Sequence, residues 1–139
     1  ASKRKTEAQQ MIFELQGKLV MKDYLTAKLY YDLGTYTGNA SYTADMRING
    51  NNFLACITTA QNALKDYPYT SMREDISILL LRAKHKLGSE SVLEKKEERM
   101  RETIDEYYAF KNEFPESKYM KEVEAIYKDA SKYVKELNE

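Results

Sequence analysis

The sequence is poor in the residues that interrupt helices. It contains five glycines and two prolines among 139 residues, and nearly every tight turn or sheet corner needs one of these residues or a polar substitute. We therefore expect long helices. The chain also has one cysteine and one histidine. This excludes an internal disulfide, a cysteine-based zinc site and a pair of histidines on one metal ion within the chain.

A charge excess of either sign is missing as well. The 22 Lys and Arg residues balance 22 Asp and Glu residues. A net charge near zero provides no electrostatic basis for binding nucleic acid or an anionic membrane surface. The longest aliphatic run, residues 78–81, is far shorter than the roughly 20 apolar residues that span a bilayer. We expect no nucleic acid as a partner and no direct contact with a membrane.

Apolar residues recur at spacings of three and four along most of the chain, which predicts amphipathic helices. The predicted helices cover residues 3–34, 52–66, 71–87, 90–113 and 117–137, and a polar segment over residues 35–51 is predicted to be a loop. In the first helix, the residues expected to be buried are Ile12, Leu15, Leu19, Tyr24, Ala27, Tyr30, Tyr31 and Leu33.

The ends of these helices carry local signals. Gly34 and Gly88 are each expected to stop a helix, since glycine adopts the left-handed conformation that closes many helices. Ser71 and Glu74 have the spacing of a capping box, in which each side chain bonds a free backbone N–H at the start of the helix.

A shift of 47 residues aligns two parts of the chain. Tyr67-Pro68 meets Phe114-Pro115, and in both copies a hydroxyl residue and an amphipathic helix follow. The matched pairs are Thr70 with Ser117, Asp75 with Glu122, Ile76 with Val123, Leu79 with Ile126 and Ala83 with Ala130. Recurrence of a helix–turn–helix unit is typical of stacked repeats, in which each pair of helices buries its apolar stripe on the next pair.

These residues resemble the tetratricopeptide repeat. Tyr30-x-x-Leu33-Gly34 is similar to its aromatic-x-x-Leu-Gly signature, Leu87-Gly88 to the second half of that signature, and Pro68 and Pro115 to its closing proline. The resemblance implies an all-α fold, namely a tetratricopeptide-like stack of antiparallel helical hairpins. This α-solenoid fragment would have a long first helix and a terminal capping helix, and would form a single repeat domain over residues 1–139.

Two longer segments carry a more specific pattern: residues 23–34, DYLTAKLYYDLG, and residues 60–70, AQNALKDYPYT. Residues 107–117, YYAFKNEFPES, repeat the end of the second segment. Together these segments resemble the BamD family of outer-membrane assembly lipoproteins. The resemblance covers roughly residues 10–130. It implies a non-catalytic scaffold subunit of the machinery that assembles β-barrel proteins in the outer membrane, with the periplasmic domains of the barrel subunit BamA as its partner.

The same resemblance implies a place in the cell. The chain would be the C-terminal fragment of a longer lipoprotein at the periplasmic face of the outer membrane. Its contact with the membrane would then be indirect, through a lipid anchor that this chain lacks.

The residues themselves do not point to catalysis. His85 lies between Lys84 and Lys86 and is interpreted as a surface or groove-edge residue of a helix. Cys56 is interpreted as a small packing residue, since the sequence offers it no base partner. The five glycines are scattered and form no phosphate-binding loop. We expect a protein that is not an enzyme and that needs no cofactor and no metal.

Aromatic residues are dominated by tyrosine, with twelve tyrosines and no tryptophan. Tyrosine suits protein interfaces because it offers a rigid apolar ring with a polar tip. The same ring can stack on a sugar. Two alternatives to the assembly scaffold therefore stay open: a generic cell-envelope repeat adaptor and a tyrosine-rich carbohydrate-binding module.

The candidate partner-binding residues lie on the polar side of helix 52–66 and in the turn after it. They are Thr59, Asn62, Asp66 and Tyr69. Their position suggests the role, because this helix adjoins the polar segment 35–51 and belongs to the repeats that would face BamA.

Overall fold

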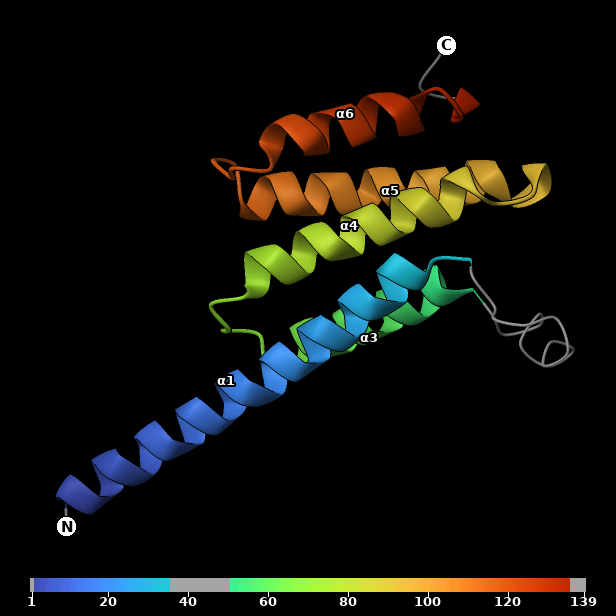
Figure 1. Cartoon of the computed structure of the whole chain (residues 1–139). Helices are drawn as coiled ribbons and strands as arrows, with labels where there is room; N and C mark the ends of the chain where they lie inside the picture. Colours follow the sequence, from blue (N-terminus) through green and yellow to red (C-terminus); the bar gives the residue numbers. More distant parts are fainter. Residues whose placement is uncertain (1, 36–50, 136–139) are drawn as a thin grey trace, which may run out of the picture.

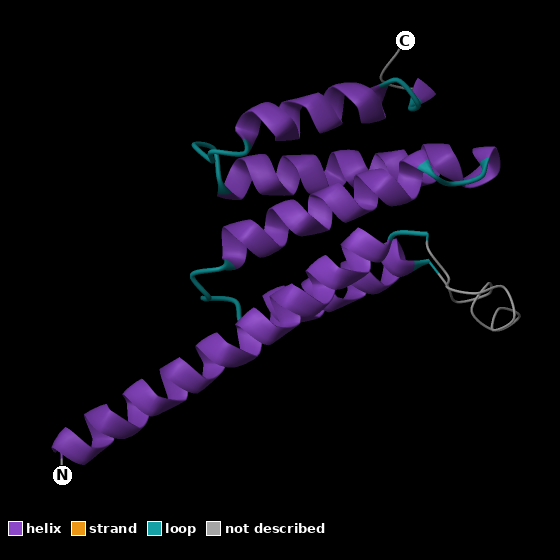
Figure 2. Ribbon diagram, in the orientation of Figure 1, coloured by secondary structure: helices purple, strands orange, loops and turns teal. Residues whose placement is uncertain are grey.

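In a computed structural model, residues 2–35 and 51–135 are described, and the regular elements among them are all α-helices (Figure 2). The predicted all-α fold class is therefore confirmed. The helices are α1 (Ser2–Leu33), α3 (Asn52–Asp66), α4 (Arg73–Ser89), α5 (Leu93–Glu113) and α6 (Met120–Ser131). The loop predicted over residues 35–51 lies, apart from its two end residues, outside the described residues.

The helices form one stack in which each runs antiparallel to the next (Figure 1). Packing follows the chain order, from α1 with α3 through α5 with α6. In addition, α1 touches α4, and α4 touches α6. The three helices α1, α4 and α6 therefore follow one another along one side of the stack.

Helix α1 is much longer than its neighbour, with 32 residues against 15 in α3. Its N-terminal half extends beyond the rest of the stack (Figure 1), and every residue from Ser2 to Leu19 is exposed. The sequence-based expectation that Ile12, Leu15 and Leu19 are buried is therefore wrong. The same holds for Leu33 at the other end of the helix, which is 38% exposed. The apolar spacing was recognised correctly, but spacing alone does not show whether a neighbour reaches that part of the helix.

The core has two main parts, which share helix α4. One joins α1, α3 and α4, and the other joins α4, α5 and α6. Helix α4 contributes Ile76 and Leu79 to the first part and Ile78 and Leu81 to the second. Burying each such side chain is worth about 1.5–3 kcal/mol. The aliphatic run at residues 78–81 thus makes α4 the central helix, apolar on two sides.

The turn between α3 and α4 recurs between α5 and α6. Tyr67 ends α3 with φ −129° and ψ 64°, and Phe114 ends α5 with φ −126° and ψ 63°. The residues just before the next helices, Met72 and Tyr119, also share their conformation, with φ −90° in both and ψ of 7° and 2°. The 47-residue repeat in the sequence is therefore a repeat of backbone geometry.

The hydroxyl residue of each turn accepts an equivalent hydrogen bond from the backbone. Thr70 Oγ1 accepts a hydrogen bond from the backbone N–H of Met72 at 3.1 Å, and Ser117 Oγ accepts one from Tyr119 at 3.0 Å. Such a side-chain bond offers the backbone an alternative to the helix. This explains why α4 begins at Arg73 instead of residue 71, and α6 at residue 120 instead of 117.

Two other predicted boundaries also differ. Helix α5 begins at Leu93 instead of residue 90, because α4 continues to Ser89 and the chain then needs three residues to reverse. Helix α6 ends at Ser131 instead of residue 137, where the backbone tightens into turns such as the bond from the N–H of Tyr133 to the carbonyl of Ala130.

The predicted capping box at Ser71 and Glu74 is wrong. The residue preceding α4 is Met72, which makes no side-chain capping bond. Glu74 instead accepts a hydrogen bond from the hydroxyl of Ser117 in the following turn. The tertiary contact between the two repeats therefore takes the carboxylate that the local pattern assigned to the helix end.

The two glycines expected to stop helices behave differently. Gly34 ends α1 with φ +56°, in the left-handed region that favours glycine. Gly88 does not stop α4, which continues to Ser89. A Cβ at Gly88 would come within 3.0 Å of the sulfur of Met100. This glycine therefore allows α5 to pack closely, a tertiary role that the sequence pattern does not reveal.

Candidate functional site

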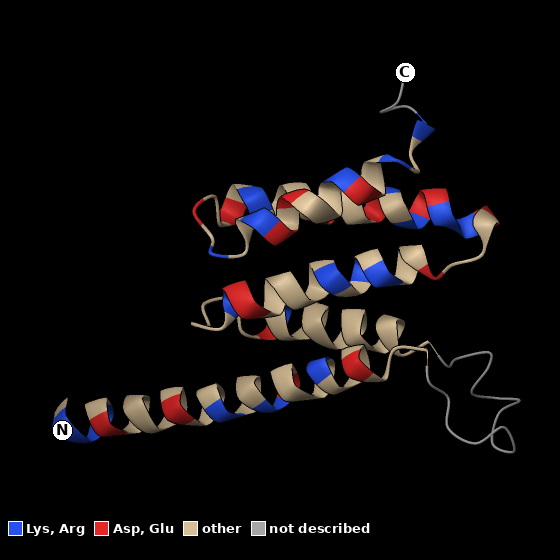
Figure 3. Ribbon diagram, turned by 45° about the horizontal axis from the view of Figure 1, so that its top comes forward, with Lys and Arg blue, Asp and Glu red and all other residues tan. Residues whose placement is uncertain are grey.

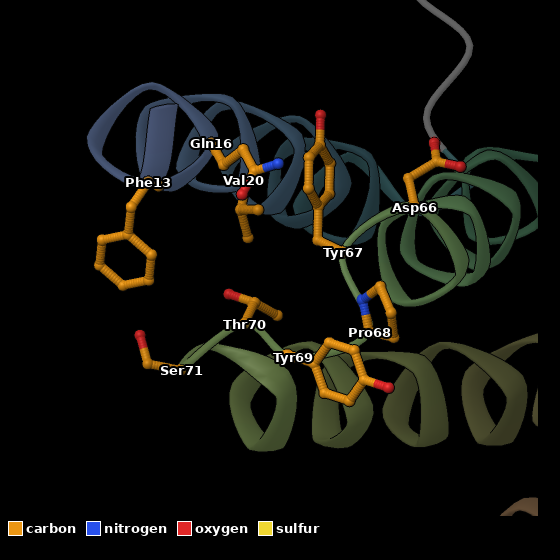
Figure 4. Close-up of a pocket in the computed structure, with 10 residues that line it drawn as sticks. Phe13, Gln16, Val20, Asp66, Tyr67, Pro68, Tyr69, Thr70 and Ser71 are labelled. Atoms are coloured by element: carbon orange, nitrogen blue, oxygen red, sulfur yellow. The ribbon is translucent and has the colours of Figure 1, made fainter. Parts of the chain in front are cut away.

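Two of the four candidate residues line a hollow between α1 and the α3–α4 turn. The hollow encloses about 300 Å³. In Figure 4, Phe13 and Val20 of α1 face Thr70 and Ser71 across it. Its lining residues are Phe13, Gln16, Gly17, Val20, Asp66, Tyr67, Pro68, Tyr69, Thr70 and Ser71. The protruding half of α1 supplies one wall and the repeated turn supplies the other.

The chemistry of this hollow suits an apolar group with a cation beside it. Aromatic and aliphatic side chains from both walls offer apolar surface, while Asp66 and Tyr69 stand at the edge (Figure 4). Tyr69 is 97% exposed. A rigid aromatic ring that pays little entropy on contact is a common anchor in protein interfaces.

Thr59 and Asn62 lie farther back on α3 and do not line the hollow. Thr59 is half-buried and Asn62 is exposed. Asn62 precedes Asp66 by about one helical turn, or roughly 6 Å along the helix axis. The structure thus brings Asp66 and Tyr69 together, and continues the polar strip through Asn62 and Thr59 along the same helix.

The turn below the hollow is held in place from the second repeat. Arg73 forms an ion pair with Glu113 at the end of α5 and donates a hydrogen bond to the carbonyl of Pro68 at 3.2 Å. Arg73 therefore ties the start of α4, the first turn and the end of α5 together. The wall that carries Asp66 and Tyr69 is accordingly part of the rigid stack.

A second polar surface, which the sequence analysis missed, runs between α4 and α6. Arg82 donates two hydrogen bonds to the carboxylate of Glu122, both at 2.7 Å. His85 Nε2 lies 2.6 Å from Asp129 Oδ2, and its side chain is 20% exposed at the edge of a groove. The interpretation of His85 as a surface or groove-edge residue is therefore confirmed, while its partner Asp129 was not predicted. Farther along, Tyr119 donates to Asp75 at 2.9 Å. Each contact joins α4, or its first turn, to α6 or the residue before it.

Electrostatics along this surface follow from the pairing. The hydrogen bonds from Arg82 hold the pKa of Glu122 below its ordinary value, and the bond to Glu122 raises the pKa of Arg82. The bond that Tyr119 donates to the carboxylate of Asp75 raises the pKa of that phenol. All three shifts favour the protonation states found at neutral pH. Both basic and acidic residues lie along these helices (Figure 3).

A groove of about 260 Å³ opens beside these ion pairs. It is lined by Tyr31 of α1, by Arg82, His85 and Lys86 of α4, and by Glu122, Ala125 and Ile126 of α6. Burial raises the pKa of Tyr31. Three helices that lie far apart in sequence meet here. The only sequence signal that could have found the groove is the 47-residue repeat, which makes α4 and α6 neighbours in a stack.

The described residues offer little for nucleophilic or metal chemistry. Cys56 is fully buried, and burial raises the pKa of its thiol to about 12; a thiol in this state is a poor nucleophile at neutral pH. Within residues 2–35 and 51–135, no group of three or more His, Cys, Asp or Glu side chains could hold a metal ion. Across the same residues, no helix combines the length and apolar character needed to cross a bilayer.

The chain matches no protein-family model and no curated protein sequence. The tetratricopeptide and BamD-like interpretations therefore stay predictions from the motifs quoted above.

Proposed function

We propose that this chain is a non-catalytic scaffold that binds other proteins through the surfaces of a tetratricopeptide-like stack. The recurrence of the aromatic-proline turn at residues 67–72 and 114–119, with matching backbone angles, carries the proposal. Stacked helical repeats expose broad, rigid surfaces, and partners bind to such surfaces or to the turns at their edges.

The motifs shared with the BamD family indicate which complex the scaffold serves. We assign the chain to the outer-membrane β-barrel assembly machinery, as the C-terminal part of a lipid-anchored subunit at the periplasmic face. Its partner is the set of periplasmic domains of BamA. The hollow at the α3–α4 turn is the docking point, because it combines an apolar lining, an exposed aromatic ring at Tyr69 and a carboxylate at Asp66.

The proposal is tested by measuring binding to the BamA periplasmic domains of the same organism. The variant Asp66→Lys with Tyr69→Ala reverses one charge and removes the exposed ring. We expect affinity to fall about tenfold or more, since loss of an interface anchor commonly costs more than about 1 kcal/mol. Thermal unfolding should stay nearly unchanged, because both side chains are exposed.

A matched control is available in the second copy of the turn. Glu116 occupies the position equivalent to Tyr69 and is also exposed. The variant Glu116→Lys changes the net charge by the same amount as Asp66→Lys, but away from the hollow, and should leave affinity unchanged. Unaltered binding by the double variant would remove the site assignment. Absence of binding by the unmodified chain would remove BamA as the partner.

Carbohydrate binding is the second candidate, favoured by the nearly complete exposure of Tyr69 beside a hollow. Titration calorimetry with cell-wall oligosaccharides would then give saturable heat. A parallel fluorescence titration would show a change in tyrosine emission. Loss of both signals in Tyr69→Ala would support this function over the scaffold.

A further inference from the structure

Helix α1 has a second apolar face on the side away from the stack. Its buried side is marked by Val20 and Ala27, which are 2% and 1% exposed. The outer side exposes six large apolar side chains between 38% and 70%: Met11, Leu15, Met21, Leu25, Leu29 and Leu33. The exposed side chains of Ile12 and Leu19 lie on the flank of the helix, nearer to its buried side. Exposed apolar side chains gathered on one face mark an interaction site in a folded protein.

Helix α4 also has two apolar sides, and both of them are buried against other helices. Its first side packs on α1 and α3, and its second side packs on α5 and α6. Helix α1 packs on α3 and α4 through one side only among the described residues. The outer face of α1 therefore corresponds to the second apolar side of α4, but no helix in the described part of the chain packs on it.

The spacing along this face is that of a helix seam. Residues 11, 15, 18, 22, 25 and 29 follow one another at alternating steps of four and three, which is the heptad spacing of paired helices. Leucine or methionine occupies the two outer positions at each end, and Lys18 and Lys22 occupy the centre. A helix with the same spacing can therefore pack along this line.

The positions of the seam are also symmetric in sequence about residue 20, although the side chain of Val20 itself is buried in the stack. Met11 and Leu29 lie nine residues before and after it, and Leu15 and Leu25 lie five residues before and after it. When two identical helices run antiparallel with Val20 at the centre, Met11 meets Leu29 and Leu15 meets Leu25, twice each. The sequence of α1 thus complements itself in reverse.

We propose that the outer face of α1 binds the same face of a second copy of this chain, as an antiparallel helix pair centred on Val20. Charge supports this arrangement at the flank of the seam. In the antiparallel register, Glu14 of one copy lies across from Lys28 of the other, so two opposite-charge pairs form. Both side chains are exposed in the single chain and available for this contact.

The central lysines limit how tight the pair is. Lys18 of one copy faces Lys22 of the other, and like charges across a seam are unfavourable. The apolar area compensates for this repulsion. The outer apolar side chains offer several hundred Å² per copy, of the same order as the roughly 800 Å² per partner that a standard protein interface buries. Area alone does not set affinity, and with lysines at the centre of the seam we expect a weak, reversible dimer.

Sedimentation of the 139-residue chain tests the association. We expect a reversible dimer at about 50 μM that dissociates on dilution, as mass action requires for an interface of this class. Leu15→Glu with Leu25→Glu should give a monomer with the helical circular dichroism of the unmodified chain. Leu93→Glu is the matched control, since Leu93 is 86% exposed at the start of α5 and lies off this face.

The outcomes decide the proposal in both directions. A chain that sediments as a monomer at 50 μM and above overturns it. So does a dimer that survives the two glutamates, or one that Leu93→Glu disrupts equally. Lys22→Glu supplies an independent check, because it turns the two central lysine contacts into opposite-charge pairs. We expect it to strengthen the dimer several-fold at low salt.

Disulfide trapping tests the antiparallel register. Positions 11 and 29 should crosslink when a Met11→Cys chain is mixed with a Leu29→Cys chain. Met11→Cys alone should not crosslink to itself, because its two copies would lie about 27 Å apart along the pair, beyond the reach of a disulfide. Self-crosslinking at position 11 would indicate a parallel pair and overturn the proposal. Cys56 is buried and does not compete.

This inference concerns a different surface from the proposed docking point. The seam uses the outer face of α1, whereas Asp66 and Tyr69 lie in the α3–α4 turn. Loss of the dimer in the two-glutamate variant should leave the Asp66 and Tyr69 effect on BamA binding in place, so failure of either proposal can be recognised separately.

Discussion

Gly34 is the residue at which conformation and contact both require glycine. It adopts φ +56°, and a Cβ there would come within 3.0 Å of the ring of Phe53. Phe53 is 5% exposed and begins the packing of α3 on α1. The end of α1 and the start of α3 are therefore fitted to each other at this point, and the backbone N–H of Asn52 donates to the carbonyl of Gly34 at 3.0 Å.

Gly34→Ala should lower the free energy of unfolding by about 1–2 kcal/mol, which is the cost of a left-handed conformation for a residue with a Cβ. Urea unfolding followed by circular dichroism measures the change. Gly17→Ala is the matched control, because Gly17 lies within α1 and a Cβ there meets nothing within 4 Å. It should raise stability by about 0.5–1 kcal/mol. Equal effects at both positions would contradict this explanation.

Between elements, Arg82 and Glu122 join α4 to α6 through a bidentate ion pair. The guanidinium and carboxylate meet through two parallel hydrogen bonds, a geometry that is stronger and more specific than a single bond. The two side chains remain 31% and 42% exposed, so solvent screens the attraction and its net contribution is at most about 1 kcal/mol.

Glu122→Gln should therefore destabilise the protein by less than about 1 kcal/mol at pH 7. Because Arg82 lowers the pKa of Glu122 in the folded state, the stabilisation is complete above the pKa of the unfolded side chain, about 4.3, and is lost as the pH falls through the folded-state value. The difference between the two proteins should shrink below about pH 4.

Chemical unfolding at a series of pH values checks this prediction. Glu116→Gln, at an exposed position in the α5–α6 turn, should follow the unmodified protein at every pH. A difference between Glu122→Gln and the unmodified protein that stays constant down to pH 3 would show that the ion pair does not act through the charge of Glu122.

The whole molecule is a chain of neighbouring contacts with α4 at its centre. Leu81 of α4 is fully buried. Among the described residues, α6 packs on one side only, and the N-terminal half of α1 extends away from the stack (Figure 1). In such a stack, local stability depends on how many neighbours each helix has.

Hydrogen exchange should therefore be slowest for the backbone amides of residues 78–81 and fast for those of residues 2–18. The measurement should be made at a concentration at which the chain is monomeric, since a second copy on α1 would slow exchange there. Equal protection of α1 residues 2–18 and α4 in the monomer would contradict this view of the stack.

Local patterns in the sequence were sufficient where the physical cause is local. Helix α3 has the bounds predicted for it, residues 52–66, because its polar start and the Tyr67-Pro68 step both act within a few residues. The recurrence of that step at Phe114-Pro115 predicted a second turn with the same geometry. Gly34 ended its helix for an equally local reason.

The sequence analysis was wrong or incomplete wherever a distant partner decided the outcome. Glu74 bonds Ser117 instead of capping its own helix, and Gly88 makes room for Met100 instead of ending α4. His85 has a partner 44 positions away, in Asp129. No local spacing encodes these pairs, because they exist only once α4 and α6 are neighbours.

The sequence by itself determined that the chain is helical, where most of its helices lie, and that one turn occurs twice. The tertiary structure decided which apolar faces are covered. Periodicity measures how apolar a face is, and a face is buried only where another helix is long enough to reach it. That difference explains why the leucines of α4 form the core while those of α1, with similar spacing, remain on the surface.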